Sequence, residues 1–190
     1  PSPMVRMAAL QAIVAAPPEL RPSFGMNLLS DPVRAVRAQA ALTFVETRDL
    51  LPLEAARAYT GAAEEYRESM LATASLPESL TVLAEFEFRM GDNDQAVEYL
   101  QHATRLDPRF AAAHHSYGLA LVRERRYSEA LVELERAYEL EPGNARFAYV
   151  YAVALNSRGL VDEAVAVLDQ ARQDFPDDPE IQSFWQMLSQ

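Results

Sequence analysis

Three stretches of the sequence decide the fold: GDNDQAVEYLQHATRLDPRF at residues 91–110, RRYSEALVELERAYELEPGN at residues 125–144 and GLVDEAVAVLDQARQDFPDD at residues 159–178. They align with an offset of 34 residues, and four columns are identical in all three copies. The matching positions are Ala96, Ala130 and Ala164; Leu100, Leu134 and Leu168; Ala103, Ala137 and Ala171; and Pro108, Pro142 and Pro176. A fixed period of this length indicates a stack of repeated supersecondary units.

Each copy predicts one helix of a helix pair. The two alanines lie seven residues apart on one helical face, where small side chains let a second helix approach closely. The proline ends the helix because it has no N–H to donate. Gly91 and Gly159 suit the turn between the two helices of a pair, and Arg125 takes this place in the middle copy. The chain is therefore predicted to be all-α and built from antiparallel helix pairs.

This pattern resembles the tetratricopeptide repeat family, with units at residues 77–110, 111–144 and 145–178. The resemblance implies an α-solenoid whose first helices line a concave groove. Leu83 and Gly118 fit the family's Leu-Gly core pair, whereas Glu87 stands where the family usually has a large aromatic residue. Residues 179–190 predict a capping helix whose apolar face covers the end of the stack; that face consists of Ile181, Phe184, Trp185 and Leu188.

Residues 1–76 follow a different pattern, with an offset of 31 that links Pro1, Val5, Arg6 and Ala9 to Pro32, Val36, Arg37 and Ala40. The string SDPVRAVRAQAALTF at residues 30–44 resembles the second helix of a HEAT repeat, which implies that Asp31 caps the helix and Pro32 occupies its first turn. A short helix is expected over residues 19–29. A long joining helix is expected from Leu53 to about Ala74, and its core-facing residues would be Leu53, Ala56, Tyr59, Ala63, Tyr66 and Met70.

A HEAT-like start followed by tetratricopeptide repeats is similar to the C-terminal region of a group of bacterial multihaem cytochrome-like proteins. This resemblance implies a periplasmic location and a longer polypeptide, and the start of the sequence within a repeat agrees with the second point. The residues alone leave the cytoplasm open as well. The sequence has no cysteine, which excludes disulfides and covalent haem attachment in this segment, so we expect no cofactor here.

The charge distribution excludes one class of partner. Residues 1–76 carry seven arginines against eight acidic residues, and residues 77–190 carry ten arginines against twenty, within a net charge of −11. Nucleic acid needs a basic stripe, so we do not expect it as a partner. No apolar run approaches the roughly 18 residues of a membrane helix, so direct membrane insertion is not expected.

Catalysis and metal binding have little support in the sequence. His114 and His115 are adjacent, and neighbouring helical side chains point about 100° apart, so the two cannot share a ligand face. His114 is expected to pack between units. Acid pairs such as Glu64-Glu65 have no apolar surroundings that would raise a pKa, and no phosphate-binding glycine loop is present. We therefore expect neither an enzyme nor a metal site.

The resemblance implies a groove that binds a partner protein or peptide, and it assigns ten residues to this groove. They are Phe88, Arg89, His115, Leu119, Val122, Arg123, Arg146, Tyr149, Val153 and Asn156. Arginines among apolar side chains suit a peptide with an apolar anchor and an acidic group. Thr81 and Glu85 occupy positions where the family's clamp for a C-terminal carboxylate has other residues, which disfavours a chaperone tail. The alternative is a structural domain that joins or orients a neighbouring domain of the same polypeptide or forms a homo-oligomer.

Overall fold

The computed structural model describes residues 1–189, and every regular element in this range is a helix. The predicted all-α class is therefore confirmed. Two compact units make up the chain, residues 1–96 and residues 97–190. None of the described helices is both long and apolar enough to span a lipid bilayer.

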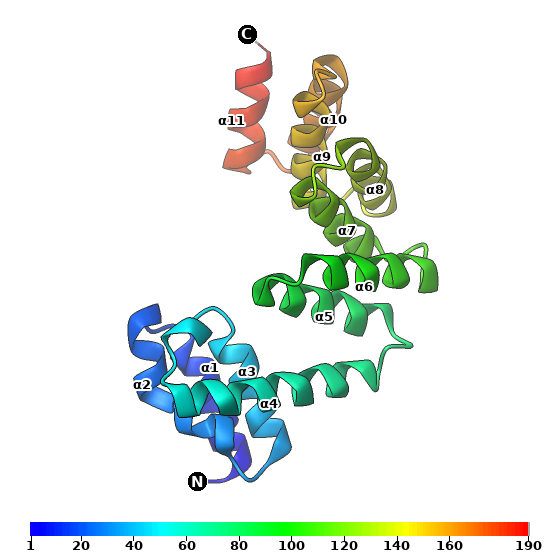
Figure 1. Ribbon diagram of the computed structural model, residues 1–190. Helices are drawn as coiled ribbons and strands as arrows, with labels where there is room; N and C mark the ends of the chain where they lie inside the picture. The colour runs from blue at the N-terminus through cyan, green and yellow to red at the C-terminus, as the bar shows by residue number, and fades with distance from the viewer. Residues whose placement is uncertain (190) are drawn as a thin grey trace. The chain divides into compact units, whose positions relative to one another are not determined.

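The α-helices of the first unit are α1 (Pro3–Ile13), α2 (Arg21–Gly25), α3 (Arg34–Phe44), α4 (Leu53–Leu71) and α5 (Pro77–Met90), with 3₁₀ turns at Pro18–Leu20, Met26–Ser30 and Arg48–Leu50. Helices α1 to α4 lie close together (Figure 1). Helix α3 packs against α1, α2 and α4, and α4 packs against α5. Leu10, Val36 and Phe44 are fully buried in this core.

The N-terminal part departs from the predicted helices in two places. The expected helix over residues 19–29 is broken into two 3₁₀ turns and α2. Gly25 lies so close to α1 that a Cβ there would be 2.6 Å from the Ile13 Cδ1 atom, so a larger residue would require the Ile13 side chain to move. Leu53, which was expected in the core, is 69% exposed at the first turn of α4.

Asp31 does not cap α3 as expected. Its carboxylate accepts a hydrogen bond from the Val33 N–H at 2.9 Å and bonds of 2.6 and 2.8 Å from the Arg6 guanidinium, while α3 begins only at Arg34. The Arg6 hydrogen bonds lower the pKa of Asp31, although burial opposes them. The carboxylate therefore ties α1 to the start of α3 across 25 residues of sequence.

Glu87, which stands where the resemblance implies a large aromatic residue, forms an ion pair in the structure. The side chain is 1% exposed, and its two oxygens accept bonds of 2.7 and 2.9 Å from the Arg67 guanidinium. The guanidinium also lies over the Phe86 ring, 5.5 Å from its centre. An ion pair with a buried carboxylate thus joins α4 and α5.

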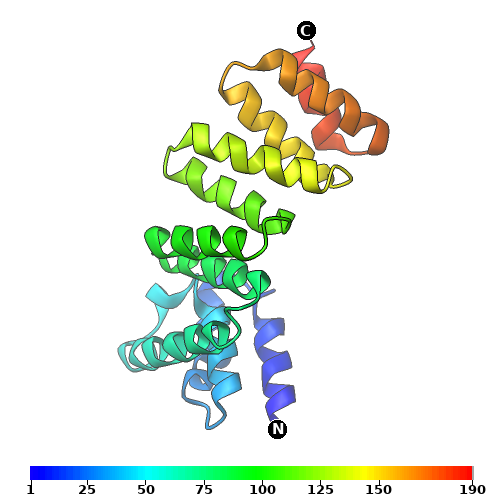
Figure 2. The ribbon, with the colours of Figure 1, turned by 90° about the vertical axis from the view of Figure 1, so that its right-hand side faces the viewer.

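The second unit consists of successive antiparallel pairs, seen from green to red in Figure 2. Helix α6 (Asn93–Leu106) leads into it, followed by α7 (Ala111–Arg123), α8 (Tyr127–Leu140), α9 (Ala145–Ser157), α10 (Val161–Asp174) and α11 (Pro179–Leu188). Each helix from α7 to α10 packs against the next one, and α11 packs against α10 and α9. The predicted domain borders at residues 76 and 178 stay predictions, since the compact units meet within α6.

The residues that define the repeat lie where the period places them. The alanines and leucines of the three identical columns are at most 2% exposed. A Cβ at Gly118 would lie 2.6 Å from the Leu134 Cγ atom, so α7 and α8 are in close contact. At the turns, Gly91 has a φ of 88°, Gly159 of 78° and Arg125 of 62°.

The predicted capping helix is confirmed. Ile181 of α11 is fully buried in the core of the second unit, and Phe184, Trp185 and Leu188 pack against the same core. The Arg172 guanidinium lies 3.6 Å from the centre of the Trp185 ring, which anchors α11 to α10.

Candidate functional site

In the second unit, the predicted groove residues form one stripe on each of two helices. His115, Leu119 and Val122 recur along α7 at the spacing of one helical face, with Arg123 beside them. On α9 the stripe consists of Arg146, Tyr149, Val153 and Asn156. Val122, Arg123, Arg146 and Val153 are exposed, and Leu119, Tyr149 and Asn156 are half-buried. A partner on these stripes would meet aliphatic, aromatic and cationic side chains.

The α9 stripe opens into a cleft that it shares with α11, here called the α9–α11 cleft. The cleft has a volume of about 440 Å³ and is lined by Ala145, Arg146, Tyr149, Val150, Asp178 and Glu180. Tyr149 is held in place by an edge contact with Phe184, with ring centres 5.7 Å apart. The Asp178 carboxylate already caps α11, because it accepts hydrogen bonds of 3.0 Å from the N–H groups of Glu180 and Ile181.

Arg146 is the cation of this cleft. Its side chain is exposed, and among residues 1–189 no carboxylate lies within ion-pair distance of it. An acidic group of a partner could therefore form a charge-assisted hydrogen bond there without first displacing an internal partner.

His115 lies beneath the surface of the α7 stripe. The residue is 6% exposed, its ring stacks on Phe147 at 4.5 Å, and neither ring nitrogen has a hydrogen-bond partner. Burial lowers the pKa of His115 to about 4, and the charge of Arg146 adds to this effect. The ring is consequently neutral at pH 7, and a partner on the groove would reach Leu119 and Arg146 before it reached His115.

The neighbouring histidine has a structural role. His114 is 8% exposed, as expected for a side chain packed between helices, and its Nδ1 lies 2.6 Å from a Glu133 carboxylate oxygen. Its Nε2 lies 3.2 Å from the Pro108 carbonyl oxygen. Within the described residues, no three His, Asp or Glu side chains are grouped closely enough to hold a metal ion.

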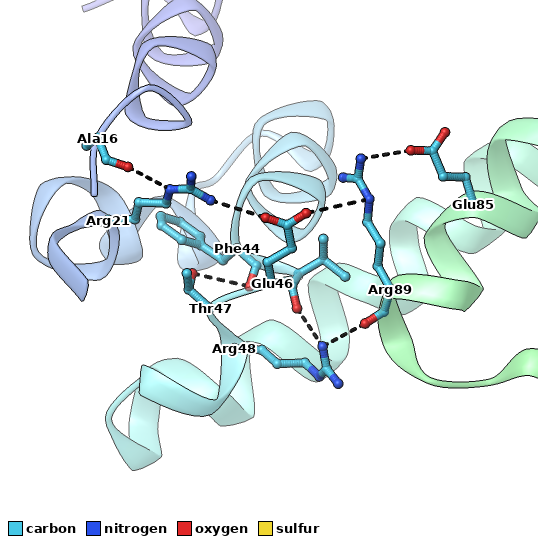
Figure 3. Close-up of polar contacts among 9 residues, drawn as sticks. Ala16, Arg21, Phe44, Glu46, Thr47, Arg48, Glu85 and Arg89 are labelled. Atoms are coloured by element: carbon cyan, nitrogen blue, oxygen red, sulfur yellow. Dashed lines mark hydrogen bonds and ion pairs between the residues drawn. The ribbon is translucent and has the colours of Figure 1, made fainter. Parts of the chain in front are cut away.

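Phe88 and Arg89, the other two predicted groove residues, lie on α5 in the first unit. Phe88 is half-buried. Arg89 donates a hydrogen bond of 2.8 Å to Glu85, and its Nε lies 4.0 Å from the Glu46 carboxylate, as Figure 3 shows. The charge of Arg89 is therefore compensated within the unit, unlike that of Arg146.

The sequence reasoning missed the contribution of α11 to the site. Residues 179–190 were expected only to cap the stack, yet Glu180 lines the cleft with Arg146. The signal was present in the period, because Glu180 follows Arg146 by 34 residues and thus takes the same place in the next first helix. Asp178, the residue that caps α11, could have been recognised from the Asp-Pro-Glu start of that helix.

Comparison with known families identifies the repeat. A tetratricopeptide repeat model matches residues 82–144, and a second tetratricopeptide repeat model matches residues 121–188. The chain is thus a tetratricopeptide repeat protein. A curated relative from Mycosarcoma maydis, small glutamine-rich tetratricopeptide repeat-containing protein 2, is 28% identical over 89 residues, which are 47% of this chain and 25% of that protein. The chain therefore spans about a quarter of the length of this relative.

Solved structures share the fold at low sequence identity. A crystal structure of MamA is similar over 92% of both chains, with a TM-score of 0.60 and 18% identity. The first tetratricopeptide domain of Spaghetti (RPAP3), bound to the HSP90 peptide SRMEEVD, matches 60% of this chain and 90% of its own, with a TM-score of 0.54 and 16% identity. The TPR2B domain of yeast Sti1, in a complex with pHsp70, matches 60% of this chain and 95% of its own, with a TM-score of 0.53 and 21% identity.

Proposed function

We propose that the chain is a protein-interaction module that binds a peptide of a partner protein on the face formed by α7, α9 and α11. The observation that carries the proposal is Arg146, an exposed cation that has no ion pair with any of residues 1–189 and lies beside Tyr149 in the lining of the α9–α11 cleft. Aromatic and arginine side chains are the residue types that most often anchor a partner. No catalytic role is part of the proposal.

The expected ligand is a segment with one apolar side chain and one acidic side chain. The apolar side chain would lie on Tyr149 and Val150, and the acidic one would accept hydrogen bonds from Arg146. The peptides bound to the related domains of RPAP3, SRMEEVD and SGPTIEEVD, also carry acidic residues, which supports this chemistry. We propose an acidic side chain of this segment as the group that Arg146 recognises.

The test is a selection of random displayed 12-residue peptides on the full chain, followed by affinity measurements on two charge-reversal variants. Arg146→Glu should weaken the selected peptides about tenfold or more, the effect of one lost charge-assisted hydrogen bond. Arg158→Glu is the matched control, because Arg158 is an exposed arginine at the other end of the same helix. It should change affinity less than twofold, and circular dichroism should show equal helicity in all three proteins.

Equal affinities of the two variants, or a failure to select any peptide, would contradict the proposal. The alternative, a structural domain of a larger multihaem cytochrome-like polypeptide with HEAT-like N-terminal repeats, stays a prediction. It would gain support from Cys-X-X-Cys-His motifs in the complete coding sequence.

A further inference from the structure

A second cleft lies entirely within the first unit, here called the N-terminal cleft. Its volume is about 380 Å³, within the range of sites that hold small ligands or single peptide residues. Four helices contribute to it: α1, α3, α4 and α5. Val14, Leu42, Val82 and Phe86 give it an apolar lining, and Val14 and Val82 are about half exposed.

Tyr66 supplies a polar group that the protein itself leaves unused. The residue is only 6% exposed, and its ring packs against Phe86 with 4.6 Å between ring centres. Its hydroxyl has no hydrogen-bond partner among residues 1–189, whereas Tyr59 bonds to the Met90 sulfur and Tyr151 to Glu135. The fully enclosed polar side-chain atoms that lack a partner belong to His115 and Trp185. The Tyr66 hydroxyl is therefore not fully enclosed, and Tyr66 is one of the residues that line the cleft.

The two charged residues that line this cleft, Arg89 and Glu85, form an ion pair with each other, and this pair belongs to a longer chain of charges outside the lining. Figure 3 shows a line of alternating sign, in which Arg21 lies 3.4 Å from Glu46, Glu46 lies 4.0 Å from Arg89, and Arg89 bonds to Glu85 at 2.8 Å. An anion in the cleft would compete with Glu46 and Glu85 for Arg89, and a cation would compete with Arg89 for Glu85. The remaining polar side chains in the lining, besides Tyr66, are neutral: the amides of Gln11 and Gln39, and the Thr43 hydroxyl, which donates a hydrogen bond to the Gln39 carbonyl oxygen.

We propose that the N-terminal cleft binds an uncharged peptide segment through one aliphatic side chain and the backbone amides beside it. The aliphatic side chain fills the space between Val14, Leu42 and Val82. The amides pair with the Tyr66 hydroxyl and with the glutamine side chains, which offer both donors and acceptors. This site is separate from the groove of the second unit, and its ligand differs because no unpaired cation lines it.

The experiment uses a minimal peptide as the probe, N-acetyl-leucine N-methylamide, titrated into the full ¹⁵N-labelled chain and followed by NMR. The side-chain amides of Gln11 and Gln39 and the backbone amides around Val82 should shift with one dissociation constant on the order of 1 mM, typical of so small a ligand. N-acetyl-leucine, which has the same side chain and a free carboxylate, should bind about fivefold or more weakly, because the carboxylate finds no free cation.

Three variants make the test specific. Val82→Trp fills the cleft from an exposed position and should abolish these shifts, whereas Val132→Trp, at an exposed valine of α8, should leave them unchanged. Tyr66→Phe keeps the ring and should weaken binding about fivefold, the effect of one hydrogen bond. Tighter binding of the free carboxylate, shifts that persist in Val82→Trp, or unchanged affinity in Tyr66→Phe would overturn the proposal. Arg146→Glu should have no effect here, so the two sites are tested independently.

Discussion

Arg125 occupies a backbone conformation that suits glycine. Its φ of 62° is left-handed, like those of Gly91 and Gly159 at the equivalent turns. A residue with a Cβ is strained in this region by roughly 1–2 kcal/mol. A glycine would remove this strain, but it would also increase the conformational entropy of the unfolded chain, which offsets part of the gain in stability.

Arg125→Gly should therefore stabilise the protein by about 1 kcal/mol, which corresponds to a rise in Tm of about 2–4 °C for a chain of this size. Thermal unfolding followed by circular dichroism measures the change. Gly159→Ala is the reverse control and should lower Tm through backbone strain alone, because a Cβ at Gly159 meets no atom within 4 Å. A lower Tm in Arg125→Gly would show that the arginine side chain contributes more than its backbone costs.

His115 makes the stability of the protein depend on pH. Burial lowers its pKa to about 4 in the folded state, against 6.5 in the unfolded chain. The unfolded state therefore binds the proton more readily, so the contribution of the neutral ring is complete above pH 6.5 and is lost as the pH falls towards 4. In this window, the free energy of unfolding should fall by up to about 1.4 kcal/mol per pH unit from this one group.

Urea unfolding of the wild type and of His115→Phe at pH 7, 5.5 and 4.5 tests this expectation. Phenylalanine keeps a ring against Phe147 and cannot be protonated. The carboxylates titrate in both proteins, so their effect cancels in the difference between the two free energies of unfolding at each pH. The variant should gain stability relative to the wild type as the pH decreases. A difference that stays constant with pH would contradict the assignment.

At the scale of single residues, the sequence predicted where a side chain lies better than it predicted which residues that side chain pairs with. The resemblance assigned both Arg146 and Arg89 to the groove, but only the structure shows that Glu85 and Glu46 compensate the charge of Arg89. Glu46 is 43 residues away along the chain and belongs to no repeat copy, so no spacing rule could have connected it to Arg89.

Between elements, the Arg67–Glu87 pair is one of the contacts that join α4 to α5. Glu87 is 1% exposed and Arg67 is partly exposed, and a lone buried carboxylate is far more costly than a paired one. Arg67→Met should thus lower the free energy of unfolding by about 3 kcal/mol, whereas adding Glu87→Met should recover most of that loss.

A double-mutant cycle by urea unfolding measures this coupling. Arg34→Met serves as the control, because the Arg34–Glu68 ion pair of α3 and α4 is more than half exposed and should contribute less than about 1 kcal/mol. If the losses of Arg67→Met and Glu87→Met were simply additive, the buried pair would not be the cause.

The elements themselves were predictable where a period existed. Between residues 91 and 178, the identical alanine, leucine and proline positions predict the second helix of each pair and the turn that follows it. This works because each of these residues affects the nearby backbone and recurs at a fixed spacing. Residues 14–33 carry no such period, and there Gly25 and the Arg6–Asp31 ion pair determine the course of the chain through contacts distant in sequence. The long joining helix was nevertheless predicted within a few residues of α4.

On the scale of the whole molecule, the family models and the fold extend over different lengths. The match to the tetratricopeptide models begins only at residue 82, whereas the structural similarity to MamA covers 92% of the chain. Helix pairs therefore continue beyond the part that the sequence identifies. The HEAT-like character of residues 1–76, the similarity to multihaem cytochrome-like proteins and the periplasmic location stay predictions.

The Arg67–Glu87 pair also restricts how this protein can evolve. A lineage that replaces only the arginine leaves a carboxylate alone in the core, and one that replaces only the glutamate leaves a half-buried guanidinium with its second partner, Glu64, at 3.5 Å. Each single replacement gives a less stable protein, although replacing both residues changes the free energy of unfolding only slightly. The two positions should thus change together or not at all, and the aromatic residue that is usual at position 87 is not reached by one substitution.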